Sequence, residues 1–226
     1  MARTEFVSFT TGGARLDGYL ARPEGEGPFP GVVVIHEGTG FNENIRDVAR
    51  RLAGEGYAAL AVDLFSGRNR VACIFRLMSG LLLNPLGHGG ISDLKASLSF
   101  LARQPGVDNS RLGAIGFCMG GGLAIAWACT DDRLSVVAPY YAINPRPLAA
   151  VARACPLVGS YPGNDFTASH ARKLDAELDR QGVEHDVKIY PGARHSFFND
   201  QGSRHDPAAS EDAWRRTLAF FKEHLD

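Results

Sequence analysis

The sequence predicts a single α/β domain, spanning residues 1–226, in which a mostly parallel central sheet carries helices on both faces. Three observations favour this class. From residue 31 onward, short apolar runs alternate with longer segments of helical periodicity. The run 31–36 is apolar at every position but the last, which is typical of a strand covered on both faces. The chain has 226 residues, enough for one large core, and contains no repeat or linker that would divide it.

The elements of the first half follow from local patterns. Residues 5–10 and 14–22 predict two strands that turn at Gly12-Gly13, where glycine tolerates a positive φ. Apolar residues at helical spacing predict a helix over 43–54, and a second buried run predicts a strand over 57–62. Residues 64–90 combine an apolar amphipathic stretch with the loop-like NPLGHGG. We expect this segment to be an excursion that contains a short helix and flanks the active site.

The second half continues the alternation of strand and helix. Its predicted helices end in turn signals such as Gly182, and its predicted strands are short and apolar. Predicted strands occupy 111–116, 135–138, 156–160 and 185–190, and predicted helices occupy 92–103, 120–129, 168–181 and 207–224. Such alternation joins parallel strands by right-handed crossovers, which places helices on both faces of the sheet.

Composition narrows the function classes. The 24 Lys and Arg against 25 Asp and Glu give a net charge of −1, so no basic excess favours nucleic acid or an anionic membrane. We find no secretory signal and no apolar run long enough to span a bilayer. The four cysteines lack metal-binding or disulfide spacing. We therefore expect a cytoplasmic protein without metal or other cofactor, monomeric or homodimeric, that acts on a small molecule.

The sharpest local signal is Gly116-Phe-Cys-Met-Gly120, between a predicted strand and a predicted helix. It matches the nucleophile elbow G-x-nucleophile-x-G, with Cys118 as the nucleophile. The backbone of so tight a turn is strained, and glycine at both ends removes side-chain clashes. The turn also places Cys118 at a helix N-terminus, where the helix dipole favours a thiolate. The competing interpretation is a buried, unreactive cysteine in a glycine-rich turn.

Two later loops supply partners for this cysteine. Asp165 follows the strand 156–160, and His195 follows the strand 185–190. The chain order nucleophile, acid, base is that of the α/β-hydrolases, and all three residues follow strands whose carboxyl ends meet at one edge of the sheet. We interpret His195 as the general base and Asp165 as the group that orients it. The other six histidines are interpreted as surface residues.

The chain resembles the dienelactone hydrolase family, a branch of the α/β-hydrolases with a cysteine nucleophile. The resemblance covers nearly the whole chain. It rests on His36-Glu37, Val62-Asp63-Leu64, Gly116-Phe-Cys-Met-Gly-Gly121, Asp165 and Gly192-Ala-Arg-His-Ser-Phe197. It implies an α/β-hydrolase fold, a triad of Cys118, Asp165 and His195, and an oxyanion hole made of the backbone amides of Gly38 and Met119. It also implies that Glu37 interacts with the resting thiol.

The resemblance further implies substrate-binding arginines. Family members hold an anionic substrate with one arginine in the excursion, where Arg76 is the best candidate beside Arg68 and Arg70. A second arginine would follow the histidine, and this chain has Asn199 there. An isolated charge in an apolar stretch must be paired or reach water, so Arg76 could equally be structural. The departure at Asn199 predicts a weaker preference for anionic lactones.

Three functions remain open from the sequence alone. The first is hydrolysis of a small carboxylic ester or lactone through a covalent acyl-enzyme. An acyltransferase would use the same triad, and a non-catalytic α/β-hydrolase domain would only bind a ligand. The sequence contains no dinucleotide-binding G-x-G-x-x-G, no phosphate-binding P-loop and no zinc-binding H-E-x-x-H motif. We favour the hydrolase, because a binding module does not require all three triad members.

Overall fold

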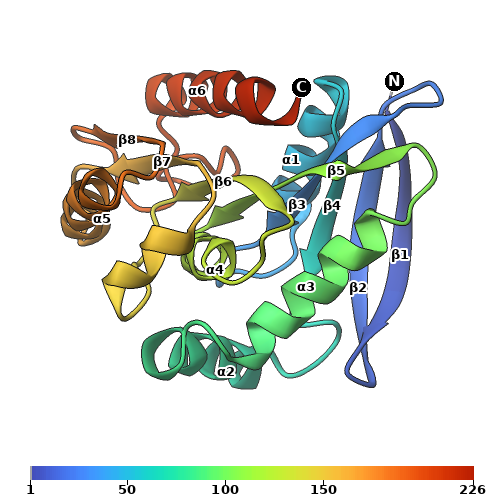
Figure 1. Ribbon diagram of the computed structural model, residues 1–226, viewed down its shortest axis with the longest axis horizontal. Helices are drawn as coiled ribbons and strands as arrows, with labels where there is room; N and C mark the ends of the chain where they lie inside the picture. The colour runs from blue at the N-terminus through green and yellow to red at the C-terminus, as the bar shows by residue number, and fades with distance from the viewer. Residues whose placement is uncertain (1) are drawn as a thin grey trace.

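A computed structural model describes residues 2–226 as one eight-stranded sheet with helices on both faces (Figure 1). The strands are β1 (Arg3–Thr11), β2 (Ala14–Arg22), β3 (Phe29–Ile35), β4 (Ala58–Asp63), β5 (Val107–Phe117), β6 (Leu134–Tyr140), β7 (Leu157–Pro162) and β8 (His185–Tyr190). The helices are α1 (Glu43–Gly54), α2 (Arg70–Leu83), α3 (Gly89–Leu101), α4 (Met119–Ala128), α5 (Thr167–Gln181) and α6 (Pro207–Leu225), with a 3₁₀ helix over Leu148–Arg153. None of the helices within 2–226 is long and apolar enough to cross a bilayer.

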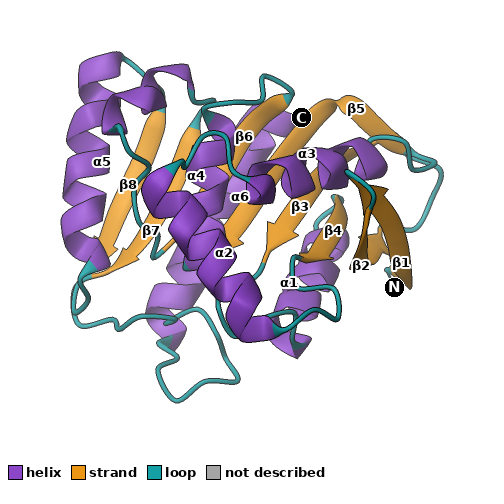
Figure 2. Cartoon of the chain, turned by 90° about the horizontal axis from the view of Figure 1, so that it is seen from below, coloured by secondary structure: helices purple, strands orange, loops and turns teal. Residues whose placement is uncertain are grey.

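The strand order is β1-β2-β4-β3-β5-β6-β7-β8. The hairpin β1-β2 adds to the edge of β4 in antiparallel orientation, and β3 to β8 are all parallel to one another. This mostly parallel sheet confirms the predicted fold class. Figure 2 shows the parallel strands ending at a common edge of the sheet. Loops that follow these strands can therefore bring distant parts of the sequence together.

Two apolar cores explain why the central strands lack polar alternation. In β3, Val33 and Ile35 pack into one core together with α2 to α5, whereas Val32 and Val34 pack into the other with α1 and α6. Figure 1 shows α1 and α6 on one side of the sheet and α3 and α4 on the other. Both faces of a parallel strand thus exclude water, and β-branched residues fit both.

The excursion differs from its prediction in length. The helix α2 has 14 residues and is longer than the short helix expected, and α3 begins at Gly89 rather than at residue 92. Asn69 starts α2 by accepting a hydrogen bond from the Ala72 amide at 3.0 Å, and no proline interrupts the stretch that follows. The helix packs on α3 and α4 through Cys73, Leu77 and Leu81, which are four residues apart.

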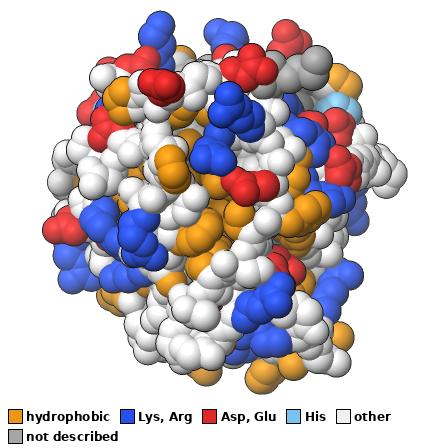
Figure 3. All heavy atoms as spheres, turned by 90° about the vertical axis from the view of Figure 1, so that its right-hand side faces the viewer, with side chains coloured by type: hydrophobic (Ala, Val, Ile, Leu, Met, Phe, Trp, Pro, Cys, Tyr) orange, Lys and Arg blue, Asp and Glu red, His pale blue; other side chains and the backbone are white. Residues whose placement is uncertain are grey.

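The β1-β2 hairpin forms one edge of the sheet, at the end away from β8. Figure 3 shows acidic and basic side chains interspersed on this face. Arg22 pairs with Glu5 at 2.7 Å, and Arg15 pairs with Asp17 at 2.7 Å, across or along the two strands. Polar pairs of this kind suit an edge hairpin with one face in water.

Candidate active site

Cys118 lies on a strained turn between β5 and α4. Its backbone has φ 54° and ψ −113°, in a region that residues other than glycine rarely adopt. A Cβ at Gly116 would lie 2.2 Å from the carbonyl oxygen of Gly120, and one at Gly120 would lie 2.5 Å from that of Ile35. Only glycine fits these two positions, as the elbow pattern predicts. The Cys118 amide donates to the Tyr140 carbonyl at 3.0 Å, which fixes the turn to the end of β6.

The sulfur of Cys118 faces the two backbone amides that the resemblance assigns to the oxyanion hole. Burial and then the carboxylate of Glu37 raise the pKa of the Cys118 thiol to about 11, against the amides of Met119 and Gly38, which lower it. The helix dipole therefore does not make a thiolate here, because burial and a nearby negative charge outweigh it. The resting thiol is neutral near pH 7, in line with the expected influence of Glu37.

His195 and Asp165 meet where the loops after β8 and β7 run side by side. His195 Nδ1 and a carboxylate oxygen of Asp165 form a short hydrogen bond, and the Asp165 side chain is only 3% exposed. Backbone bonds tie the loops together, from the Gly163 amide to the Tyr190 carbonyl at 2.7 Å and from the Asn164 amide to the Ala193 carbonyl at 3.0 Å. With Nδ1 engaged, Nε2 is the nitrogen available for proton transfer.

Glu37 is buried between the elbow and the histidine loop. Its carboxylate accepts hydrogen bonds from Ser196 Oγ at 2.7 Å and from Asn199 Nδ2 at 3.3 Å. Both donors are neutral, so neither cancels the negative charge near Cys118. Ser196 reaches Glu37 from a left-handed backbone with φ 63°, directly after His195. Asn199 thus stands where an arginine was expected and binds Glu37; its contact with substrate stays a prediction.

Arg70, the first residue of α2, connects the excursion to the loop that follows β3. This residue donates to the Gly38 carbonyl from Nε at 3.2 Å and from Nη2 at 3.0 Å. Arg76, the predicted substrate contact, instead pairs with Asp93 of α3 at 3.3 Å. The Arg76 side chain is 40% exposed, so it is paired and also reaches water. Its role toward substrate stays a prediction.

The sequence interpretation of His36 as a surface residue is wrong. The side chain is fully buried at the end of β3. Its Nδ1 lies 2.7 Å from the Glu37 carbonyl, and its Nε2 accepts from the Leu64 amide at 3.1 Å. Burial lowers the pKa of His36, so the imidazole is neutral and ties the loops after β3 and β4 together. Sequence reasoning also assigned no role to Ser196 or to Tyr141, whose ring lies 5.1 Å from that of His195.

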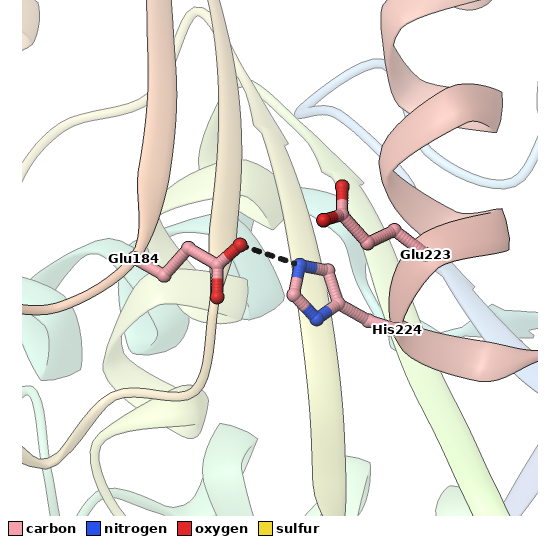
Figure 4. Close-up of side chains that lie close together, drawn as sticks. All are labelled: Glu184, Glu223 and His224. Atoms are coloured by element: carbon pink, nitrogen blue, oxygen red, sulfur yellow. Dashed lines mark ion pairs between the residues drawn. The ribbon is translucent and has the colours of Figure 1, made fainter.

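Residues 2–226 hold one group of three side chains that could bind a metal ion: Glu184, Glu223 and His224 (Figure 4). Their ligand atoms lie within 4.8 Å of one another, and His224 Nε2 is 3.4 Å from Glu184 Oε1. Glu184 precedes β8, at the amino edge of the sheet. The group therefore lies at the edge opposite Cys118, and a surface ion pair accounts for its geometry.

Comparison with known proteins identifies the family of this chain. The model of the dienelactone hydrolase family matches residues 16–225. The chain belongs to this family. A protein of Saccharolobus solfataricus that is provisionally named a carboxymethylenebutenolidase is 32% identical over 96% of this chain and 97% of the relative. A protein of Escherichia coli K12 with the same provisional name is 32% identical over 97% of this chain and 86% of the relative.

Solved structures show the same α/β-hydrolase architecture. One neighbour, described as a dienelactone hydrolase-like promiscuous phosphotriesterase from metagenomic libraries, has a TM-score of 0.89 and 26% identity. The superposition covers 100% of this chain and 99% of that one. The predicted family and the predicted fold are both confirmed, and the family indicates a dienelactone hydrolase-like hydrolase.

Proposed function

We propose that this protein hydrolyses small carboxylic esters or lactones through a covalent acyl-enzyme on Cys118. One observation carries the proposal. A thiol on a strained turn faces two backbone amides, and an imidazole oriented by a buried carboxylate lies at the same edge of the sheet. Acyl transfer needs these three parts: a nucleophile, donors for the oxyanion and a base.

The reaction follows from the roles of these groups. The sulfur first leaves the amides of Gly38 and Met119, because the carbonyl oxygen of the substrate needs them. His195 Nε2 takes the thiol proton, and the sulfur attacks the carbonyl carbon. The oxyanion then binds the two amides, where each donor is worth ~100- to 1,000-fold in rate. His195 returns the proton to the leaving alcohol, and the carbon–oxygen ester bond breaks.

Water completes the cycle. His195 takes a proton from a water molecule as the water oxygen attacks the thioester. The second tetrahedral intermediate collapses, the carboxylic acid leaves, and the proton returns to Cys118. Asp165 holds the imidazole in the orientation that both halves need. The 32% identical relatives carry the name carboxymethylenebutenolidase, and this name supports a lactone among the substrates.

The test is hydrolysis of p-nitrophenyl acetate and of a simple lactone by the wild type and by Cys118→Ala. We expect Cys118→Ala to lose roughly 1,000-fold or more in kcat. Cys155→Ala removes a different, partly buried thiol and should keep full activity. An acetylated Cys118 peptide, detected by mass spectrometry after rapid quenching, would report the intermediate directly.

Three results would reject or redirect the proposal. Full activity of Cys118→Ala would remove this thiol from the reaction. Turnover that rises with an added alcohol or amine acceptor, with transfer product exceeding acid, would indicate an acyltransferase. A protein that binds esters without turnover would be a ligand-binding domain. Because one structural neighbour is described as a phosphotriesterase, a phosphotriester such as paraoxon belongs in the substrate panel.

A further inference from the structure

Two buried tyrosines have hydroxyl groups without a hydrogen-bond partner in residues 2–226. They are Tyr141, directly after β6, and Tyr161, within β7. Both side chains are fully enclosed, with 1% and 0% exposure. A buried hydroxyl without a partner destabilises a fold, so each of these groups calls for a physical reason.

The two phenols differ in their surroundings. The Tyr141 ring lies 5.1 Å from the imidazole of His195 and 5.6 Å from the ring of Phe197. Burial, then the charges of Glu37 and Cys118, raise the pKa of Tyr141, whereas burial alone raises that of Tyr161. Tyr141 therefore stays protonated beside the reacting groups. In this state its hydroxyl can donate a hydrogen bond to an anion.

The backbone of Tyr141 is also unusual. Its φ is 39°, a left-handed conformation that is costly for a bulky side chain. The Tyr141 amide donates to the Ser160 carbonyl at 2.9 Å, which fixes this conformation against β7. Strain of this kind persists where the surrounding structure holds a side chain in one place. Here it holds a phenol that is enclosed by protein and whose ring lies against the imidazole of His195.

The strand order places Tyr141 on the far side of Cys118 from the loop that follows β3 and contains Gly38. The strands β3, β5 and β6 are neighbours, and Glu37, Cys118 and Tyr141 follow their carboxyl ends in that order. At rest the sulfur faces the Gly38 amide, on the β3 side. When a substrate oxyanion takes the amides, the sulfur has to swing away from β3, toward the side that holds Tyr141 and His195.

We propose that the Tyr141 hydroxyl donates a hydrogen bond to the sulfur of Cys118 once the sulfur has left the amides of Gly38 and Met119. This role deepens the proposed function and rests on it. The phenol keeps its own proton throughout. The thiol proton passes to His195 Nε2, and the sulfur lone pair forms the bond to the carbonyl carbon. The unpartnered hydroxyl at rest is then a donor held ready for the attacking thiolate, which makes Tyr141 a further catalytic residue.

Tyr141→Phe and Tyr161→Phe form a matched pair, because each removes one unpartnered hydroxyl and keeps the ring. We expect Tyr141→Phe to lower kcat/KM for p-nitrophenyl acetate roughly ten-fold, the value of a hydrogen bond to a charged group. We expect Tyr161→Phe to keep the wild-type value. Neither variant should lower the melting temperature, since neither loses a hydrogen bond of the resting state. A structural role for Tyr141 would lower both activity and melting temperature.

Alkylation of Cys118 by iodoacetamide tests the same contact without any ester. Peptide mass spectrometry separates Cys118 from the other three cysteines. Besides Tyr141, the charges that act on the sulfur are those of Glu37 and Asp165. Both carboxylates, and the proposed base His195, are unchanged in both variants. Between pH 7 and pH 9 we expect Tyr141→Phe to react about three-fold more slowly, because the loss of thiolate outweighs its gain in nucleophilicity. Tyr161→Phe should follow the wild type.

Each outcome decides between the possibilities. Unchanged alkylation and turnover in Tyr141→Phe would overturn the proposal. An equal fall in both variants would assign the effect to packing, and a fall together with a lower melting temperature would assign it to structure. A wild type that is alkylated but hydrolyses no ester would reject the proposed function, while the alkylation comparison would still test the contact to sulfur.

Discussion

The loops that follow β3, β5, β7 and β8 contrast with the helix α2 beside them. The loops hold side chains that are mostly buried, fixed by backbone hydrogen bonds and, at Cys118 and Ser196, by strained dihedral angles. α2 is buried on one face alone, and its other face exposes large apolar residues. These are Val71, Phe75, Leu82 and Leu83, which are 75%, 75%, 49% and 85% exposed.

We expect this difference to separate reaction chemistry from substrate recognition. Each loop has a defined backbone conformation, which hydrogen bonds to neighbouring strands and loops hold in place. α2 is fastened to the rest by its packing on α3 and α4 and by the contacts of Arg70 and Arg76. The two arginine contacts are partly exposed and contribute little stability each, whereas Cys73, Leu77 and Leu81 bury the packed face of the helix. Substitutions in the loops should therefore affect all substrates, and substitutions in α2 should affect some more than others.

Gly116→Ala should have the largest effect. The new Cβ would lie 2.2 Å from the Gly120 carbonyl oxygen, and neither backbone can yield without distorting the elbow. We expect the free energy of unfolding to fall by about 1–3 kcal/mol and activity to be lost for every ester tested. Chemical denaturation and a kinetic panel measure these two effects.

Gly54→Ala is the control for this change. Gly54 ends α1 and has no atom within 4 Å of an added Cβ. Alanine there should leave activity intact and leave stability equal or higher, because alanine restricts the unfolded chain. If Gly116→Ala behaved like Gly54→Ala, the loop after β5 would be less constrained than its backbone angles indicate.

Glu37→Gln should have an effect of intermediate size. Unlike Gly116→Ala, which abolishes activity, it should increase the reactivity of the thiol. The carboxylate raises the pKa of Cys118, so a neutral amide lowers it from about 11. At any pH below that value the thiolate fraction then rises, and we expect iodoacetamide to react several-fold faster between pH 7 and pH 9. The measurement is the alkylation rate of the Cys118 peptide as a function of pH.

Glu223→Gln controls for the loss of one negative charge. Glu223 is exposed on α6 at the opposite edge of the sheet, so its replacement should leave the profile of Cys118 unchanged. An unaltered profile in Glu37→Gln would mean that this carboxylate does not act on the thiol. Slower alkylation would mean that Glu37 activates the thiol instead of holding it neutral.

The sequence was sufficient for the parts of the site that the backbone specifies. Glycine spacing around Cys118 and the chain order Cys118, Asp165, His195 both follow from strand-to-loop geometry, which leaves a local signature. The hydrogen bond between Asp165 and His195 is present as expected. The catalytic roles of these residues stay predictions until the variants are measured.

Contacts between distant segments could not be predicted in this way. The burial of His36 depends on its bond to the Leu64 amide, 28 residues further on. Tyr141 lies beside His195, a residue 54 positions later in the chain. Two consecutive tyrosines at the end of a strand carry no pattern that indicates which of them faces the site. The length of α2 was underestimated, because a mostly apolar helix with both packed and exposed residues has weak periodicity.

Arg76→Ala should have the smallest effect, and an effect that depends on the substrate. The guanidinium pairs with Asp93 at 3.3 Å; the Arg76 side chain is 40% exposed, whereas that of Asp93 is only 10% exposed. A substrate carboxylate at the exposed end of the guanidinium would therefore share it with Asp93, because removing the partner of a mostly buried carboxylate is costly. We expect Arg76→Ala to lower kcat/KM for an anionic lactone a few-fold more than for its neutral methyl ester. Asp93→Asn, which frees the guanidinium, should shift this ratio the other way. If both variants change the two substrates equally, Arg76 serves only to fasten α2 to α3.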